Sequence, residues 1–302
     1  MSIHKRARNI MSEYYNSKRS KILLTAEQNK PEKVLALTHK IIITDDFENR
    51  VKKEIIEPIM DQMSFTALNF QKTKIDSKLS VAEKYFLDID KVAFRLLQCH
   101  KHQKNYNLVE SQRTSELKVD IQKTARHIDE CWRPLELSCE IDAFLTKWKS
   151  TLDALAKTII PLYGINSKTW GDKGNRIINQ LKNLPAERSS KVGQLLKLIE
   201  DNKEQISSII NLRDKVVHYD AECLTPFHYR VEEKKLYNPN LIWDGSIYRP
   251  HDFMSQTSEY LLDFIREFIV NSINGFVESL YIVITNDGHQ WFIPPEKIKE
   301  SK

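Results

Sequence analysis

Residues 137–162 read LSCEIDAFLTKWKSTLDALAKTIIPL. Large apolar side chains recur in this stretch at spacings of three and four, at Ile141, Phe144, Leu145, Trp148, Leu152, Leu155 and Ile159. Because side chains at these spacings share one face of an α-helix, the stretch predicts a strongly amphipathic helix whose apolar face lines a core. We expect this helix to stop at Pro161 and Gly164.

The same periodicity continues on both sides of this stretch. It predicts helices over about 81–103, 109–132, 177–184, 187–217 and 252–279. Further upstream, helical spacing around Val34 and around Val51 predicts two shorter helices, and Thr44-Asp45-Asp46 is a plausible N-terminal cap for the second. With only seven glycines and ten prolines in 302 residues, the chain is expected to be all-α or mainly α.

Pro134 is the best candidate for a domain boundary, because a proline after Trp132-Arg133 cannot extend a preceding helix without cost. Residues 1–133 then form an N-terminal helical region of undetermined role, and residues 134–302 form a C-terminal helical domain. Between 227 and 248, short aromatic and β-branched runs surround turn residues, which predicts a small β-hairpin inserted between helices. A further hairpin is expected from residues 281–293, around an Asn-Asp-Gly turn.

Charge and cysteine content narrow the class of protein. The 46 basic and 41 acidic residues leave a net charge of +5, which is compatible with a nucleic-acid partner but does not require one. The cysteines at 99, 131, 139 and 223 form no CxxC pair, which favours a reducing compartment over a disulfide framework. Neither a signal-peptide core nor an apolar run of membrane-spanning length is found, so we expect a cytoplasmic protein without a membrane partner.

Residues 211–218, NLRDKVVH, close the predicted helix over 187–217 and contain the candidate site. Arg213 and His218 are separated on a regular helix by about 140° and about 7.5 Å, so they do not share a face. A site that uses both needs the helix to end or bend at His218, or a second copy of the chain opposite. Asp214 precedes His218 by one helical turn, so its carboxylate can reach the imidazole, fix its tautomer and support its charged form.

The spacing of arginine and histidine is weak evidence alone, because 14 arginines and 9 histidines give roughly 0.4 chance matches in a chain of this length. A second match is in fact present at Arg95 and His100. There the residue after arginine is Leu96, which cannot orient a histidine. We interpret Arg95 and His100 as part of a basic, solvated face. The cluster at 100–104 is interpreted as a solvated or RNA-facing patch rather than a metal site.

The segment Leu212–Tyr219 resembles the signature of the HEPN superfamily (higher eukaryote and prokaryote nucleotide-binding domains): arginine, a polar residue, three variable positions and histidine. The apolar pair before His218 and the aromatic Tyr219 after it are also similar to that family, as is the helix order over roughly 134–285. One position departs from the pattern. Subfamilies paired with a nucleotidyltransferase antitoxin have a tyrosine where this chain has Asp220, so that partnership is not implied.

The resemblance implies a helical bundle of HEPN type that cleaves RNA without a metal or other cofactor, in a homodimer whose two motifs face each other. His218 would take the proton of the ribose 2′-hydroxyl or protonate the leaving 5′-oxygen. Arg213 would hold the phosphate and Asp214 would orient His218. The products would be a 2′,3′-cyclic phosphate and a 5′-hydroxyl.

Three further residues, Lys215, Tyr219 and Trp243, are candidates for contact with RNA. Domains of this kind often serve as toxins or in defence against phage, and the sequence does not identify an antitoxin or regulatory protein. Two alternatives stay open. The chain can be a non-catalytic helical module that binds a nucleotide or a protein, or a helical scaffold in which Arg213, Asp214 and His218 are ordinary residues of a helix end.

Overall fold

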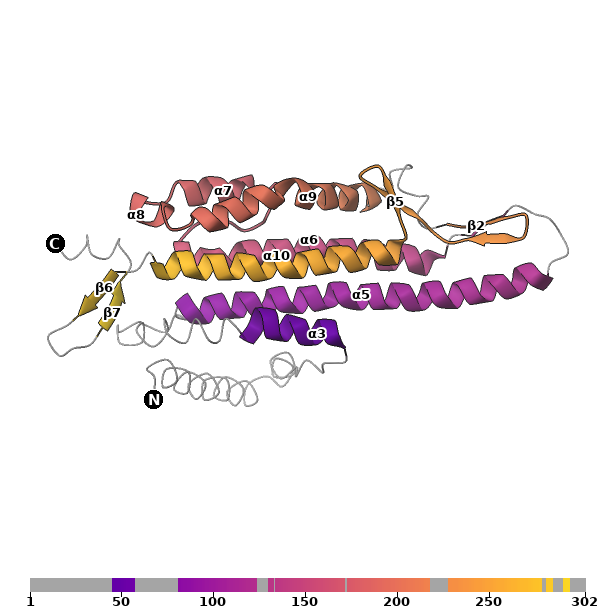
Figure 1. Ribbon diagram of the computed structural model, residues 1–302, viewed down its shortest axis with the longest axis horizontal. Helices are drawn as coiled ribbons and strands as arrows, with labels where there is room; N and C mark the ends of the chain where they lie inside the picture. The colour runs from indigo at the N-terminus through magenta and orange to yellow at the C-terminus, as the bar shows by residue number, and fades with distance from the viewer. Residues whose placement is uncertain are drawn as a thin grey trace, which may run out of the picture.

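The computed structural model describes residues 45–57, 81–123, 130–132, 134–171, 173–217, 228–278, 281–284 and 290–293 (Figure 1). Its helices are α3 (Asp46–Val51), the π-helix η1 (Lys52–Ile56), α5 (Val81–Lys123), α6 (Leu135–Tyr163), α7 (Asn175–Lys182), α8 (Ala186–Ser189), α9 (Gly193–Val217) and α10 (Pro250–Glu278). The described chain is therefore mainly helical, as the sequence predicted.

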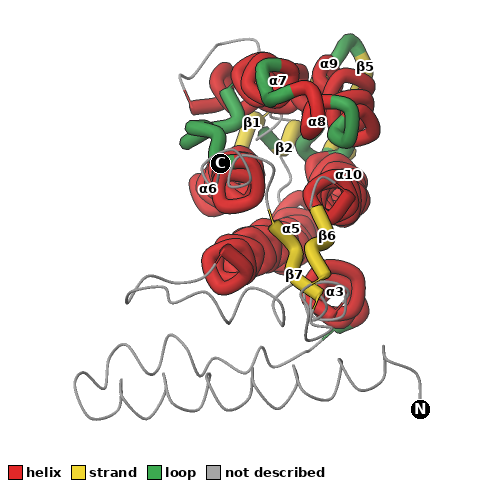
Figure 2. Tube along the Cα trace, turned by 90° about the vertical axis from the view of Figure 1, so that its left-hand side faces the viewer, coloured by secondary structure: helices red, strands yellow, loops and turns green. Residues whose placement is uncertain are grey.

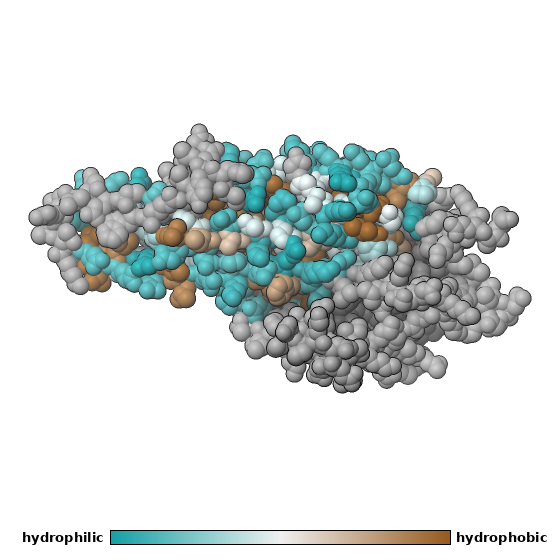
Figure 3. All heavy atoms as spheres, turned by 180° about the vertical axis from the view of Figure 1, so that it is seen from behind, coloured by the Kyte–Doolittle hydropathy of each residue, from teal (hydrophilic) through white to brown (hydrophobic). Residues whose placement is uncertain are grey.

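The long helices run side by side in three layers. Figures 1 and 2 show α6 and α10 in the middle, α5 with α3 on one side, and α7, α8 and α9 on the other. Polar side chains cover most of the described surface on the face shown in Figure 3, with apolar groups in separate smaller areas. None of the helices in the described ranges is both long enough and apolar enough to cross a membrane.

The apolar face predicted for α6 lines the core. All seven of its large apolar side chains are at most 1% exposed, and they belong to one hydrophobic cluster that extends from Phe47 in α3 to Phe276 in α10. Trp148 also donates its indole N–H to the backbone oxygen of Thr257 at 3.1 Å, which joins α6 to α10. Burying an apolar side chain of this kind contributes roughly 1.5–3 kcal/mol, so this cluster is the main source of stability of the bundle.

The sequence predicted two helices over 81–103 and 109–132, but α5 is a single helix of 43 residues that ends at Lys123. The reason is that residues 104–108 contain neither glycine nor proline, and Tyr106 is fully buried on the face that packs against the bundle. The polar character of these residues was therefore misleading. Residues 130–132, expected in the second helix, form strand β1 (Glu130–Trp132) instead.

Of two further helix ends, the one predicted at Gly164 is confirmed and the other differs. Pro161 lies inside α6, which continues to Tyr163 and ends at Gly164 in a left-handed conformation (φ 68°), with the glycine N–H bonded to Ile160 O at 2.8 Å. A proline near the end of a helix removes only one backbone hydrogen bond, which the packing of the last turn offsets. The helix expected over 187–217 is divided into α8 and α9 by a turn at 190–192.

The hairpin predicted near 227–248 is present, and it is one of two. β2 (Tyr229–Glu232) and β3 (Lys235–Tyr237) form an antiparallel sheet with β1, while β4 (Leu241–Trp243) pairs with β5 (Ser246–Tyr248). Both hairpins close with left-handed residues, Glu233-Lys234 and Asp244-Gly245, as type I′ turns require. The predicted C-terminal hairpin is confirmed as β6 (Tyr281–Ile284) and β7 (Gln290–Ile293).

Candidate functional site

The last turn of α9 positions the first two residues of the motif. Leu212 and Val216 are one helical turn apart and both are buried, so they fix the rotation of the helix end against the core. That rotation leaves Arg213 and Asp214 partly exposed and Lys215 exposed. The structure thus places these three candidate residues together at one end of the bundle, where α9 reaches Val217.

The Arg213 side chain is partly buried at this end of the bundle. Its Nη1 atom donates to Oδ1 of Asp214 at 2.7 Å, and the side chain is 27% exposed against 49% for Asp214. Its Nε atom is buried and has no hydrogen-bond partner among the described residues. Because this atom has almost no accessible surface, a bound anion would meet the terminal nitrogens of the guanidinium, on the exposed part of the side chain. A guanidinium placed in this way can hold a phosphate.

The predicted contact between Asp214 and His218 involves a residue outside the described ranges, as does the candidate Tyr219. That contact stays a prediction. What the structure adds is that Asp214 also accepts a hydrogen bond from Arg213, so one carboxylate oxygen is used before any contact with a histidine. That bond does not use the second oxygen of Asp214.

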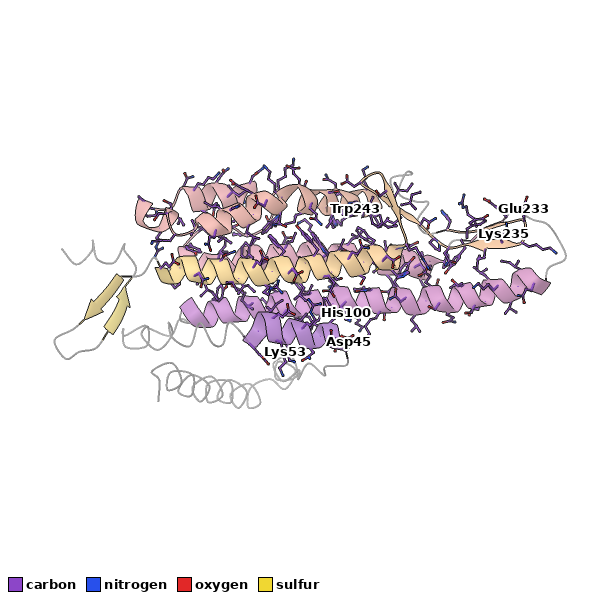
Figure 4. All side chains as sticks on the ribbon, in the orientation of Figure 1. Asp45, Lys53, His100, Glu233, Lys235 and Trp243 are labelled. Atoms are coloured by element: carbon purple, nitrogen blue, oxygen red, sulfur yellow. The ribbon has the colours of Figure 1, made fainter. Side chains whose placement is uncertain are left out.

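Trp243, the third candidate for RNA contact, lies in β4 above the start of α10 (Figure 4). Its ring is partly buried, with its centroid 5.2 Å from that of Phe253 and 5.7 Å from that of Tyr248. Its indole nitrogen is buried without a partner among the described residues. The ring thus anchors the β4–β5 hairpin on α10.

The second arginine–histidine match does not form a solvated basic face, so that interpretation was wrong. Arg95 Nη1 donates to the backbone oxygen of Ser150 at 2.7 Å, which joins α5 to α6. His100 is 12% exposed, and its Nε2 atom lies 2.7 Å from Oδ2 of Asp45 (Figure 4). The two side chains are used in helix packing, with partners that are distant in the sequence.

The carboxylate of Asp45 is strongly held in its charged form. Burial raises the pKa of this carboxyl, but hydrogen bonds from the backbone N–H of Glu48, from His100 and from Lys104 together bring it well below its usual range. The bond from Glu48 N, at 2.9 Å, is the N-terminal cap of α3 that the sequence predicted.

A cluster that the sequence did not identify lies where α5 meets the start of α10. The Glu110 side chain is 7% exposed; its Oε1 accepts from Arg249 Nη2 at 3.1 Å, and its Oε2 lies 3.4 Å from Nδ1 of His251. The hydroxyl of Tyr229 donates to the backbone oxygen of Glu110 at 3.0 Å. The available signal was a carboxylate on the buried face of α5, one turn after Tyr106, which implies a cationic partner.

Cysteine and metal chemistry find little support in the described residues. Cys99 is a free thiol, and burial raises its pKa to about 12, which leaves it protonated and unreactive at neutral pH. Among the described residues, no three His, Cys, Asp or Glu side chains gather as metal ligands would.

Comparisons of the chain with family models, with curated proteins and with solved structures found no match.

Proposed function

We propose that this chain is a metal-independent RNA endonuclease of HEPN type, in which Arg213, Asp214 and His218 form the catalytic group. The observation that carries the proposal is the state of Arg213. It is a permanently charged, forked side chain on a helical turn fixed by the buried Leu212 and Val216, and it remains 27% exposed at the end of the bundle. These are the properties of a side chain prepared for an oxyanion.

The chemistry needs only protein side chains, because RNA carries its own nucleophile. The 2′-oxygen attacks the adjacent phosphorus as its proton passes to His218. Negative charge then develops on the phosphate oxygens, next to Arg213. The bond from phosphorus to the 5′-oxygen breaks, and that oxygen leaves with a proton from a second acid. A homodimer with facing motifs would supply this acid as the other copy's histidine, and the products are a 2′,3′-cyclic phosphate and a 5′-hydroxyl.

The proposal also includes the setting in which the enzyme acts. We propose the cytoplasm, because the described cysteines Cys99 and Cys139 are free. By the resemblance to HEPN domains, a role as a toxin or an antiviral effector is the proposed context.

The test is cleavage of single-stranded RNA by the purified full chain in the presence of a metal chelator. We expect a 2′,3′-cyclic phosphate at the new end, and no cleavage where the scissile ribose is replaced by 2′-deoxyribose. The His218→Ala variant should lose activity. If it cut RNA as fast as the parent chain, the catalytic assignment would be wrong.

Sedimentation velocity tests the paired arrangement separately. A dimer at micromolar concentration is expected. A monomer that cleaves RNA would agree with the catalytic assignment but would contradict a site formed by two facing motifs.

A further inference from the structure

The structure brings α9 and α10 together as antiparallel neighbours with a definite register. Near the start of α9, the backbone of Lys191 approaches Gly275 so closely that a Cβ atom on the glycine would lie 2.7 Å from Lys191 O. Further along, the hydroxyl of Tyr260 donates to Oδ1 of Asn202 at 2.8 Å. As α9 proceeds, its partners in α10 come from progressively earlier positions, which defines the antiparallel direction (Figure 1).

This register places Arg213 and Arg249 at the same end of the bundle. Arg213 follows Asn202 by as many residues as Arg249 precedes Tyr260. At a rise of 1.5 Å per residue, each arginine is therefore about 16 Å from the Asn202–Tyr260 bond, in the same direction. Packed helices have axes about 8–10 Å apart, so the two backbones lie near each other at this end. Because Arg249 is bonded to Glu110 in α5, across α10 from α9, a nucleic-acid strand that contacts both side chains would cross the end of the bundle (Figure 2).

Arg249 is oriented by a buried carboxylate and still reaches solvent. Among the described residues, its hydrogen-bond acceptor is Glu110, whose side chain is 7% exposed, whereas Arg249 itself is 47% exposed. A guanidinium has five N–H donors, so one bond to Glu110 leaves donors for a second anion. His251 lies 3.4 Å from the other oxygen of Glu110 and 2.8 Å from Oδ1 of Asp252, so its ring is held beside the same cluster.

We propose that Arg249, positioned by Glu110, binds a phosphate of single-stranded RNA and so guides the strand toward Arg213. This subsite rests on the proposed ribonuclease function, because it names a second contact for the same substrate. The buried carboxylate fixes the direction of the guanidinium before RNA binds, which lowers the entropy lost on binding. Its chemistry suits a backbone phosphate, since a guanidinium matches the phosphate oxygens.

Binding is measured with the full chain and a single-stranded 2′-O-methyl RNA oligonucleotide, which lacks the attacking hydroxyl and is not cleaved. We expect Arg249→Met to raise Kd about three- to tenfold and to lower the slope of log Kd against log salt by about 1, as the loss of one phosphate contact requires. Arg249→Lys, which keeps the charge, should keep most of the slope. The control is Arg176→Met, an exposed arginine in α7 at the opposite end of α9, which should change neither quantity.

A purely structural role for Arg249 predicts a different pattern. If Arg249 served only to neutralise Glu110, then replacing both in Glu110→Gln with Arg249→Met would restore stability and RNA binding together. We expect the double variant to recover the melting temperature of the parent chain while its RNA binding stays weak. The double variant also keeps the test decisive if Arg249→Met alone fails to fold.

The outcomes separate this subsite from the nuclease itself. RNA binding that depends on Arg249, in a parent chain that cleaves nothing, would keep the subsite and remove the nuclease. Cleavage by the parent chain, with unchanged binding in Arg249→Met, would keep the nuclease and overturn the subsite. A parent chain that does not bind the oligonucleotide overturns the subsite.

Discussion

His100 in α5 and Asp45 at the start of α3 face each other, with Nε2 and Oδ2 separated by 2.7 Å. Phe47 stacks on the same imidazole, with ring centroids 4.5 Å apart, and Lys104 Nζ lies 2.9 Å from Oδ2 of Asp45. One carboxylate thus caps α3 and attaches it to α5. The stability of the short segment 45–57 should depend strongly on this residue.

Asp45→Ala is expected to destabilise the protein by about 1–3 kcal/mol, because it removes a helix cap and leaves His100 without its anionic partner. Urea unfolding of the full chain measures the difference. The control is Asp46→Ala, which changes the neighbouring exposed carboxylate and leaves the cap in place. Equal losses in the two variants would contradict a special role for Asp45.

The same carboxylate predicts a pH dependence. Its pKa is lower in the folded chain than in the unfolded one, so its contribution to stability is complete above the unfolded value of about 4 and is lost as the pH falls through the folded value. The difference in unfolding free energy between the parent chain and Asp45→Asn should therefore shrink as the pH is lowered below about 4. A difference that does not change between neutral and acidic pH would exclude this linkage.

Arg213 and Arg95 form a matched pair for separating catalysis from stability. Arg213→Met should change the free energy of unfolding by less than about 1 kcal/mol, since Arg213 forms a partly exposed ion pair, and should lower kcat about 100-fold or more. Arg95→Met should lower the free energy of unfolding, because it removes the bond between α5 and Ser150 in α6. It should leave kcat unchanged, because Arg95 lies outside the proposed site. Activity per folded molecule and urea unfolding are measured on both variants. Comparable activity losses would show that the arginine–histidine spacing alone does not identify the site.

Gly275→Ala tests the close contact between α10 and the turn before α9. The added methyl group would lie 2.7 Å from Lys191 O and 2.9 Å from the hydroxyl of Tyr163, so both contacts must be relieved by a shift, at a cost of about 1–3 kcal/mol. Gly193→Ala is the matched control, because a Cβ at Gly193 meets no atom within 4 Å and φ there is not positive. Thermal unfolding should show a lower melting temperature for Gly275→Ala alone.

The sequence predicted those parts of the fold that depend on local spacing. The apolar face of α6, the cap at Asp45 and the Asp244-Gly245 turn are each encoded within a few neighbouring positions. The Glu233-Lys234 turn was not predicted. The continuity of α5 was missed because the burial of Tyr106 depends on elements far along the chain. The end of α6 at Gly164 was predicted, and the packing of Leu162 and Tyr163 keeps the turn that contains Pro161 helical.

In the candidate site too, the sequence identified residues that are neighbours in the chain and missed those that only the tertiary fold brings together. Arg213, Asp214 and Lys215 were found because they are adjacent in the sequence. Glu110 and Arg249 were not, since they are more than a hundred residues apart and only the tertiary fold brings them into contact. His100 was misread for the same reason, because its partner Asp45 lies in another helix.

The end of α5 extends beyond the helical bundle, where it contacts the β1–β2–β3 sheet. Arg113 pairs with Glu136, in the first turn of α6, so the residues of α5 beyond this point extend past the rest of the helical bundle (Figure 1). Tyr229 in β2 lies against this overhang, with its hydroxyl 3.1 Å from that of Thr114. A helix needs no new nucleus to continue, so this segment can persist as an extension of α5. Tyr229 joins the first turn of the extension to a strand that lies more than a hundred residues later in the chain.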